Sequence, residues 1–151
     1  MTEREHILQQ LQQIGDSIVA MFGRNCETCI HDLTDLHHSL IHIKGSVTGR
    51  QIGAPATDLL VKLLKNAHGK PEDLHNYRTV SGDGRTLKSS TIFISDSSGT
   101  PIFAFCINFD TTEYFNASQA LQQFLLHEPS ESPADAAETF SHSPSETIDA
   151  L

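Results

Sequence analysis

The sequence has few basic residues, and their distribution argues against one class of partner. Ten lysines and arginines stand against 19 acidic residues, which gives a formal net charge of −9 over 151 residues. Six of the acids lie in residues 127–151, where there is no lysine or arginine, so residues 1–126 are only mildly acidic. Because a nucleic-acid-binding surface is normally basic, we do not expect these residues to bind DNA directly.

Long apolar runs are also absent. No segment approaches the ~20 apolar residues that span a bilayer, and residues 1–6 lack the basic and apolar regions of a signal peptide. Three cysteines are an odd number in a chain large enough to form a core without disulfides, which favours reduced thiols in the cytosol. We therefore expect a soluble, cytoplasmic protein with no membrane partner.

Three segments have the spacing of amphipathic helices. In residues 3–22 apolar side chains recur at three- and four-residue steps, and Gly23 fits the end of that helix. This helix either covers one face of a sheet or pairs with a second copy of itself, and we predict a homodimer through it. Residues 57–66 and 111–126 are the other two predicted helices, and Pro55 fits the first position of the former.

Five segments rich in β-branched and aromatic residues predict strands at 26–33, 39–44, 77–81, 87–95 and 102–110. The last two flank Asp96-Ser97-Ser98-Gly99, a hairpin signal, and are predicted to be the central strands. Side chains alternate along a strand, so the last strand has two unlike faces. Large side chains fill a core on one face: Phe103, Phe105, Ile107 and Phe109. Smaller ones leave room for a cavity on the other: Ile102, Ala104, Cys106 and Asn108.

Two strands, a helical crossover and three strands, in this order, predict an α+β fold of the PAS type. It has a five-stranded antiparallel sheet with helices packed on it, a ligand cavity between them, and an extra amphipathic helix at the N-terminus. We assign this domain to residues 1–126. Residues 127–151, rich in proline, serine and acids, are expected to be a disordered linker. Ser145 fits a helix N-cap before Ile148 and Leu151, which suggests a fragment whose next domain follows.

Several segments of the sequence resemble the YheO-like PAS sensor domains of bacterial transcriptional regulators. They are Cys26-Glu-Thr-Cys-Ile-His-Asp-Leu33, Gly49-Arg-Gln-Ile-Gly-Ala-Pro-Ala-Thr-Asp58, Asn76-Tyr77, Asp83-Gly-Arg-Thr-Leu-Lys-Ser-Ser-Thr91 and Cys106-Ile-Asn-Phe-Asp110. The family includes a repressor of D-arginine utilisation. The resemblance implies a regulator that senses a small polar metabolite, such as an amino acid or a derivative, and passes the signal to a C-terminal helix-turn-helix domain. These 151 residues contain no such domain, so DNA binding is expected only through it.

Polar side chains on the two central strands are the first candidates for ligand binding. Ser89, Ser90, Thr91 and Asn108 offer hydroxyl and amide groups that can orient a small ligand, or that can simply bond across strands. The turn decides which serine shares a face with Asn108. A three-residue loop at 97–99 would place Ser90 there, and a two-residue turn would place Ser89 and Thr91 there. Cys106 is expected to line the same cavity.

Charged and aromatic candidates lie outside those strands. Arg50, in a glycine-flanked loop before a helix, is suited to bind a ligand carboxylate through two hydrogen bonds, or is an ordinary surface arginine. Asp58, in the first turn of that helix, interacts favourably with the helix dipole; if the ligand carries an amine, Asp58 or Asp32 can pair with it. Asn76 and Tyr77 either close the mouth of the pocket or, for Tyr77, join the core.

The sequence provides no complete catalytic or metal-binding pattern, so we expect neither an enzyme nor a resident cofactor. His31 beside Asp32 suggests a catalytic pair, but neighbours on a strand face opposite sides, and no nucleophile motif accompanies them. Nine histidines and Cys26-x-x-Cys29 raise the alternative of a haem-, metal- or flavin-binding PAS module. The histidine spacing fits no zinc motif, however, and the cysteines lie on a strand as expected for structural residues.

Overall fold

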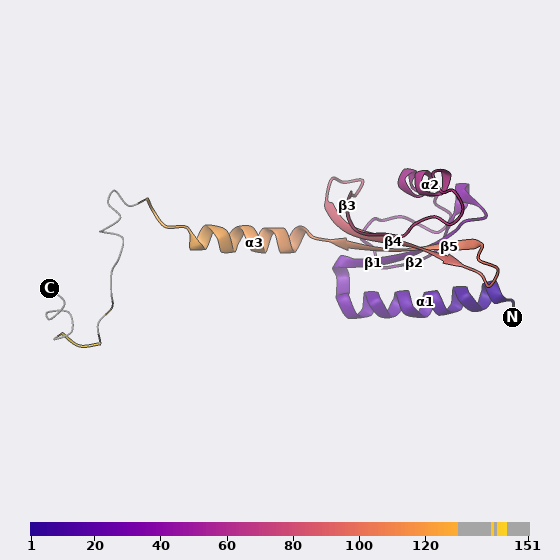
Figure 1. Cartoon of the computed structure of the whole chain (residues 1–151). Helices are drawn as coiled ribbons and strands as arrows, with labels where there is room; N and C mark the ends of the chain where they lie inside the picture. The colour runs from indigo at the N-terminus through magenta and orange to yellow at the C-terminus, as the bar shows by residue number, and fades with distance from the viewer. Residues whose placement is uncertain (130–139, 141, 145–151) are drawn as a thin grey trace. The chain divides into compact units, whose positions relative to one another are not determined.

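A five-stranded antiparallel sheet lies between two helices (Figure 1). The computed structural model describes residues 1–129, 140 and 142–144. The elements in order are α1 (Glu3–Phe22), β1 (Cys26–Asp32), β2 (Leu40–Lys44), α2 (Asp58–Lys65), β3 (Leu74–Val80), β4 (Thr86–Ser95), β5 (Pro101–Asp110) and α3 (Thr112–Leu125). The strands are arranged as β2-β1-β5-β4-β3. The predicted α+β fold is confirmed.

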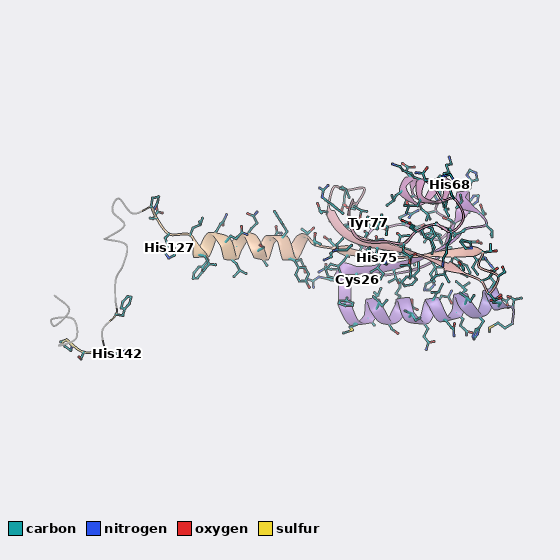
Figure 2. All side chains as sticks on the ribbon, viewed as in Figure 1. Cys26, His68, His75, Tyr77, His127 and His142 are labelled. Atoms are coloured by element: carbon teal, nitrogen blue, oxygen red, sulfur yellow. The ribbon has the colours of Figure 1, made fainter. Side chains whose placement is uncertain are left out.

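The chain forms two units, and the unit described below is residues 1–116, which holds the sheet, α1 and α2. Side chains project from both faces of this sheet (Figure 2). Among the described residues, no helix is long and apolar enough to cross a membrane. The predictions for the linker and for a helix start at Ser145 fall mainly on residues 130–139, 141 and 145–151, which lie outside the described residues.

Helix α1 covers one face of the sheet, one of the two arrangements expected from its apolar stripe. Its first turn is closed by a capping box, in which Thr2 and Glu5 each bond the other's backbone N–H. Gly23 ends it, as predicted, with a positive φ of 82°. Leu11 and Val19 are buried against the sheet, and this packing provides most of the stability of such a helix.

The core between α1 and the sheet is apolar and tightly packed. Its buried members are Leu11, Ile30, Ile102, Phe103 and Phe105. Phe103 is fully buried, and the guanidinium carbon of Arg4 lies 4.5 Å from the centre of its ring. All four large side chains predicted for this face of β5 lie on the α1 side: Phe103 and Phe105 in the core, Ile107 at its edge, and Phe109 against the ring of Phe22 in α1.

The turn between β4 and β5 has three residues, but a bulge next to it shifts the pairing of the two strands by one residue. The side chains that share a face are therefore not those expected from a three-residue turn. The backbone N–H of Asp96 bonds the carbonyl of Thr100, which encloses residues 97–99. The register then shifts between Ile94 and Ser95, so that Ile94 pairs with Phe103 and Ser95 with Pro101. Ile102 is the extra residue, and it joins the α1-side core. Its predicted position on the cavity face is therefore wrong.

Two other predicted details are corrected. Strand β3 begins at Leu74, three residues before the predicted start at Tyr77, and its pairing with β4 is interrupted between Leu74 and Tyr77. Pro55 is not the first residue of a helix: Thr57 is the N-cap of α2, and its hydroxyl oxygen accepts the backbone N–H of Leu60 at 3.2 Å. Pro55 thus precedes the N-cap and lies outside the helix.

Candidate functional site

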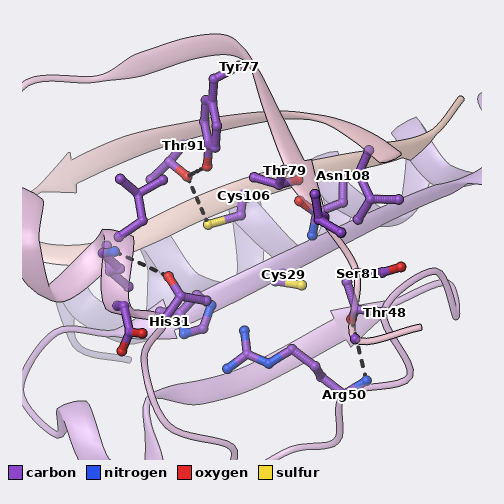
Figure 3. Close-up of a pocket in the computed structure, with 17 residues that line it drawn as sticks. Cys29, His31, Thr48, Arg50, Tyr77, Thr79, Ser81, Thr91, Cys106 and Asn108 are labelled. Atoms are coloured by element: carbon purple, nitrogen blue, oxygen red, sulfur yellow. Dashed lines mark hydrogen bonds between the residues drawn. The ribbon is translucent and has the colours of Figure 1, made fainter. Parts of the chain in front are cut away.

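A cavity of about 530 Å³ lies between the sheet and α2 (Figure 3). Side chains from β1, β3, β4 and β5 line it, together with residues 48–50 and the first turn of α2. This is the face of β5 that carries Ala104, Cys106 and Asn108. The expectation of a cavity on the face with small side chains is confirmed.

A chain of hydrogen bonds crosses four strands beneath this cavity. Ser89 donates its hydroxyl proton to the amide oxygen of Asn108 at 2.8 Å, and Thr79 lies 2.8 Å from Ser89 on the other side. The amide nitrogen of Asn108 donates to the carboxylate of Glu27 at 3.0 Å. Because of the bulge in β5, Ser89 pairs with Asn108; the three-residue loop was expected to place Ser90 there instead.

Glu27 ends this chain and was not among the residues that the sequence singled out. It is fully buried on β1. One carboxylate oxygen accepts the backbone N–H of Thr48 at 2.9 Å, and the Thr48 hydroxyl lies 3.0 Å from both oxygens. A signal was available: Glu27 alternates with Cys29 and His31 along the strand, which places all three on the cavity face.

A second group of polar side chains lies in the cavity wall. The Tyr77 hydroxyl is 2.7 Å from the Thr91 hydroxyl, which is 3.4 Å from the sulfur of Cys106. Cys29 is paired across the strands with Cys106. Burial raises the pKa of all three groups with a titratable proton, Tyr77, Cys29 and Cys106. The two thiols are therefore protonated at neutral pH, and they are poor nucleophiles and metal ligands.

His31 and Arg50 lie close together in the cavity, and the guanidinium of Arg50 points toward His31 (Figure 3). His31 is buried, and its Nδ1 lies 2.8 Å from the hydroxyl of Ser39. Burial and, second, the charge of Arg50 lower the pKa of His31 to about 4. The imidazole is therefore neutral at pH 7. Arg50 also donates a hydrogen bond to the carbonyl of Pro55, and Asp58 lines the cavity from α2.

Arg85, the residue just before β4, holds the loop of residues 47–50 through Val47. Arg85 donates to the backbone carbonyl of Val47 and, at 2.6 Å, to the carboxylate of Asp110. Asp110 in turn accepts the backbone N–H of Thr112 at 3.0 Å, at the beginning of α3. One guanidinium thus contacts both the loop that carries Thr48 and Arg50 and the carboxylate that bonds the first residue of α3.

The structure brings most of the predicted site residues together, with three exceptions. Asn108, Thr91, Arg50, Tyr77, Asp58, Cys106 and His31 line the cavity. Ser89 lies beneath its floor. Asn76 and Ser90 lie instead beside a smaller apolar hollow of about 350 Å³ on the α1 face, where the backbone N–H of Asn76 bonds the Ser90 hydroxyl.

Asp32 also points away from the cavity, as expected for a neighbour of His31 on a strand. It forms an ion pair with Arg4 of α1 at 2.8 Å. Burial acts to raise the pKa of Asp32, but hydrogen bonds from Thr34 and Arg4 lower it below its ordinary value. Asp32 and His31 therefore cannot act as a catalytic pair. Within the described part of the chain, no group of three or more potential ligands could hold a metal ion.

Comparison with known proteins finds one family and several relatives. The model of the family described as "YheO-like PAS domain" matches residues 2–126. The protein YheO of Escherichia coli (strain K12) is 34% identical over 129 residues, which are 84% of this chain and 52% of YheO. Transcriptional regulator DauR of Pseudomonas aeruginosa is 25% identical over 118 residues, 78% of this chain and 54% of DauR. This chain spans about half the length of the curated relatives it matches.

Solved structures with a similar arrangement are more distant. The PAS domain of a protein from Colwellia psychrerythraea has 19% sequence identity and a TM-score of 0.40, over 71% of this chain and 98% of that chain. An RNA-binding light-oxygen-voltage receptor has 14% identity and a TM-score of 0.45, over 72% of this chain and 36% of that chain.

Proposed function

The chain belongs to the family of YheO-like PAS domains, and from this membership we propose that it is the ligand-sensing domain of a bacterial transcriptional regulator. It binds a small polar metabolite, such as an amino acid or a derivative, in the cavity between the sheet and α2. A DNA-binding domain of the longer protein reads the result. The relationship to a named transcriptional regulator supports the regulatory part of this proposal.

The cavity is the observation that carries the proposal. Its volume of about 530 Å³ falls within the range of small-molecule sites, which are mostly apolar with a few polar groups in fixed positions. Here the fixed groups are Asn108, the Tyr77–Thr91 pair and Arg50. At pH 7 the thiols of Cys29 and Cys106 are protonated, because burial raises their pKa, and His31 is a weak base, because its pKa is lowered. None of these three side chains is therefore poised to act as a nucleophile or a general base.

Arg50 provides the positive charge in this cavity, and a carboxylate is the ligand group that a guanidinium binds best. Asp58, on the first turn of α2, lies at the same cavity and would pair with an amine on the ligand. Ligand contact with Arg50 would pull on residues 47–50, and Arg85 would pass this displacement to Asp110 and the start of α3. A ligand that favours one position of this loop would shift the population of α3 conformations.

We propose further that the chain is a homodimer through α1. The stripe of α1 that faces the sheet is occupied within the chain, so the contact would use its exposed apolar side chains, Ile14, Met21 and Phe22. Light scattering at high micromolar concentration measures this directly, and a monomeric mass there would refute the dimer.

A thermal-shift screen of amino acids and small carboxylates tests ligand sensing. A ligand at a hundredfold excess over its Kd stabilises the folded state by about 2.7 kcal/mol, which raises the Tm by several degrees. The Arg50→Gln variant should lose this rise. Arg78→Gln, which removes the same charge from an exposed position on β3, should keep it.

Two results would contradict the proposal. If no compound in these classes raises the Tm of the wild-type protein, the cavity does not bind such metabolites under these conditions. If the purified protein has the absorbance spectrum of haem or flavin, or elemental analysis finds a stoichiometric metal, the alternative of a cofactor-binding PAS module replaces it.

A further inference from the structure

The direction of each hydrogen bond under the cavity is determined by one residue, Glu27. A carboxylate has no proton to donate, so it can only accept. The Thr48 N–H and hydroxyl and the Asn108 amide all point their protons at it, at 2.9 to 3.0 Å. Glu27 is fully buried, so these bonds cannot be exchanged for bonds to bulk water without a large cost.

The direction of each hydrogen bond then determines the direction of the next one. Because the nitrogen of Asn108 faces Glu27, its oxygen faces Ser89, and Ser89 must donate. A serine hydroxyl has a single proton, so Ser89 can only accept from Thr79, and Thr79 must donate to it. Either direction would be possible for the Thr79–Ser89 pair alone. With Glu27 at the end of the chain, only one remains.

We propose that Glu27 in this way determines which chemical groups the cavity floor offers to a ligand. Asn108 and Thr79 both line the cavity. The second amide N–H of Asn108 has no partner within the described residues, so Asn108 has a proton left to donate to a ligand. Thr79 has used its only proton and offers oxygen lone pairs. The floor therefore selects a ligand with an acceptor oxygen at Asn108, and Arg50 in the same cavity favours an anionic one, a carboxylate.

Glu27 is thus a positioning residue, since Asn108 and Thr48 separate it from the cavity. This inference rests on the proposed function for its ligand class, but the direction of the hydrogen bonds can be tested without any ligand. The test uses two nearly isosteric substitutions, Glu27→Gln and Asn108→Asp, singly and together. Each exchanges donors and acceptors while it leaves the size and shape of the side chain almost unchanged.

The expected Tm values follow from counting donors. Glu27→Gln alone is mild, because Asn108 can turn its amide over and reverse the whole chain. Asn108→Asp alone places two carboxylates side by side in a buried site, and we expect a loss of roughly 10 °C in Tm at pH 7.5. In the double variant the new amide at position 27 donates to the new carboxylate at position 108, and Ser89 still donates, so most of the loss should be recovered. Equal losses from Asn108→Asp in both backgrounds would overturn the proposal.

The ligand class is tested with two small probes of opposite charge, acetate and methylammonium, by ¹⁵N chemical shifts. In the wild-type protein acetate should shift the side-chain signals of Asn108 and Arg50. In the double variant, where position 108 carries an acid, acetate should have no effect there and methylammonium should shift the neighbouring signals. An unchanged preference for acetate in the double variant would refute the assigned role of Asn108. If the Tm recovers in the double variant but acetate shifts no signal in the wild type, the proposed function is contradicted. The inferred direction of the hydrogen bonds would still stand.

Discussion

His31 should make the stability of this domain fall as the pH is lowered from 7 to 5. The imidazole is buried beside Arg50, and its pKa in the folded protein is about 4, compared with an ordinary value of 6.5. In the unfolded chain it takes up a proton near pH 6.5, whereas in the folded protein it stays neutral. The contribution of His31 is therefore fully present above pH 6.5 and is lost as the pH falls toward 4.

The magnitude follows from the two pKa values. Between pH 6.5 and pH 4 the loss approaches 1.4 kcal/mol per pH unit, and integration from pH 7 to pH 5 gives about 2 kcal/mol. The acids with a lowered pKa have ordinary values of 3.8 to 4.5, so they lose their contribution mainly below pH 5. The titration of His31 therefore outweighs theirs between pH 7 and pH 5.

Urea denaturation of the wild type and of His31→Asn, at pH 7 and pH 5, measures the effect. Asparagine can keep a hydrogen bond to Ser39 but does not titrate. The loss in free energy of unfolding between pH 7 and pH 5 should therefore be about 2 kcal/mol smaller in the variant than in the wild type. His75→Asn, at an exposed position on β3, should leave the pH dependence as in the wild type. A pH dependence that is the same in wild type and His31→Asn would refute the reasoning.

Three further predictions concern the core, one glycine and the thiols. Phe103→Ala should lower the free energy of unfolding by roughly 3–5 kcal/mol in urea denaturation, because Phe103 is fully buried, whereas Ile52→Ala at a 62% exposed position should change little. Gly45→Ala should lower the Tm more than Gly99→Ala: both glycines have a positive φ, but only at position 45 would the new Cβ lie 2.5 Å from the carbonyl oxygen of Cys26. The three cysteines should react slowly with a disulfide reagent at pH 8 and completely in denaturant, because burial raises the pKa of each; rapid reaction of the native protein would contradict this.

Most of the fold could be predicted from the sequence because each element carries its own local pattern. The stripe of α1, the alternation in β5 and the hairpin residues Asp96 to Gly99 each depend on neighbours a few positions away. The cavity face followed from the same alternation, since Ala104, Cys106 and Asn108 are smaller than Phe105 and Ile107 between them. Family resemblance and periodicity agreed on these points.

What could not be predicted depends on single residues and distant partners. The bulge at Ile102 changes which serine meets Asn108, yet nothing in the composition of the strand distinguishes Ile102 from its apolar neighbours. The role of Glu27 depends on Thr48, 21 positions away, and on Asn108, 81 positions away. Asn76 was expected to close the mouth of the pocket, but its φ of 55° and the break in β3 pairing put it on the other face.

The order of the strands also has a consequence for how the domain folds. Strands β1 and β2 form one local hairpin, and β3, β4 and β5 form a local meander; the sheet is completed only when β1 pairs with β5. That step closes the longest loop in the sheet and has the largest entropic cost, so we expect it to come late and to limit the folding rate. The bond between Glu27 and Asn108 lies across this junction. The cavity floor is therefore complete only after the last step of folding, and a partly folded chain has no complete site that a metabolite could bind.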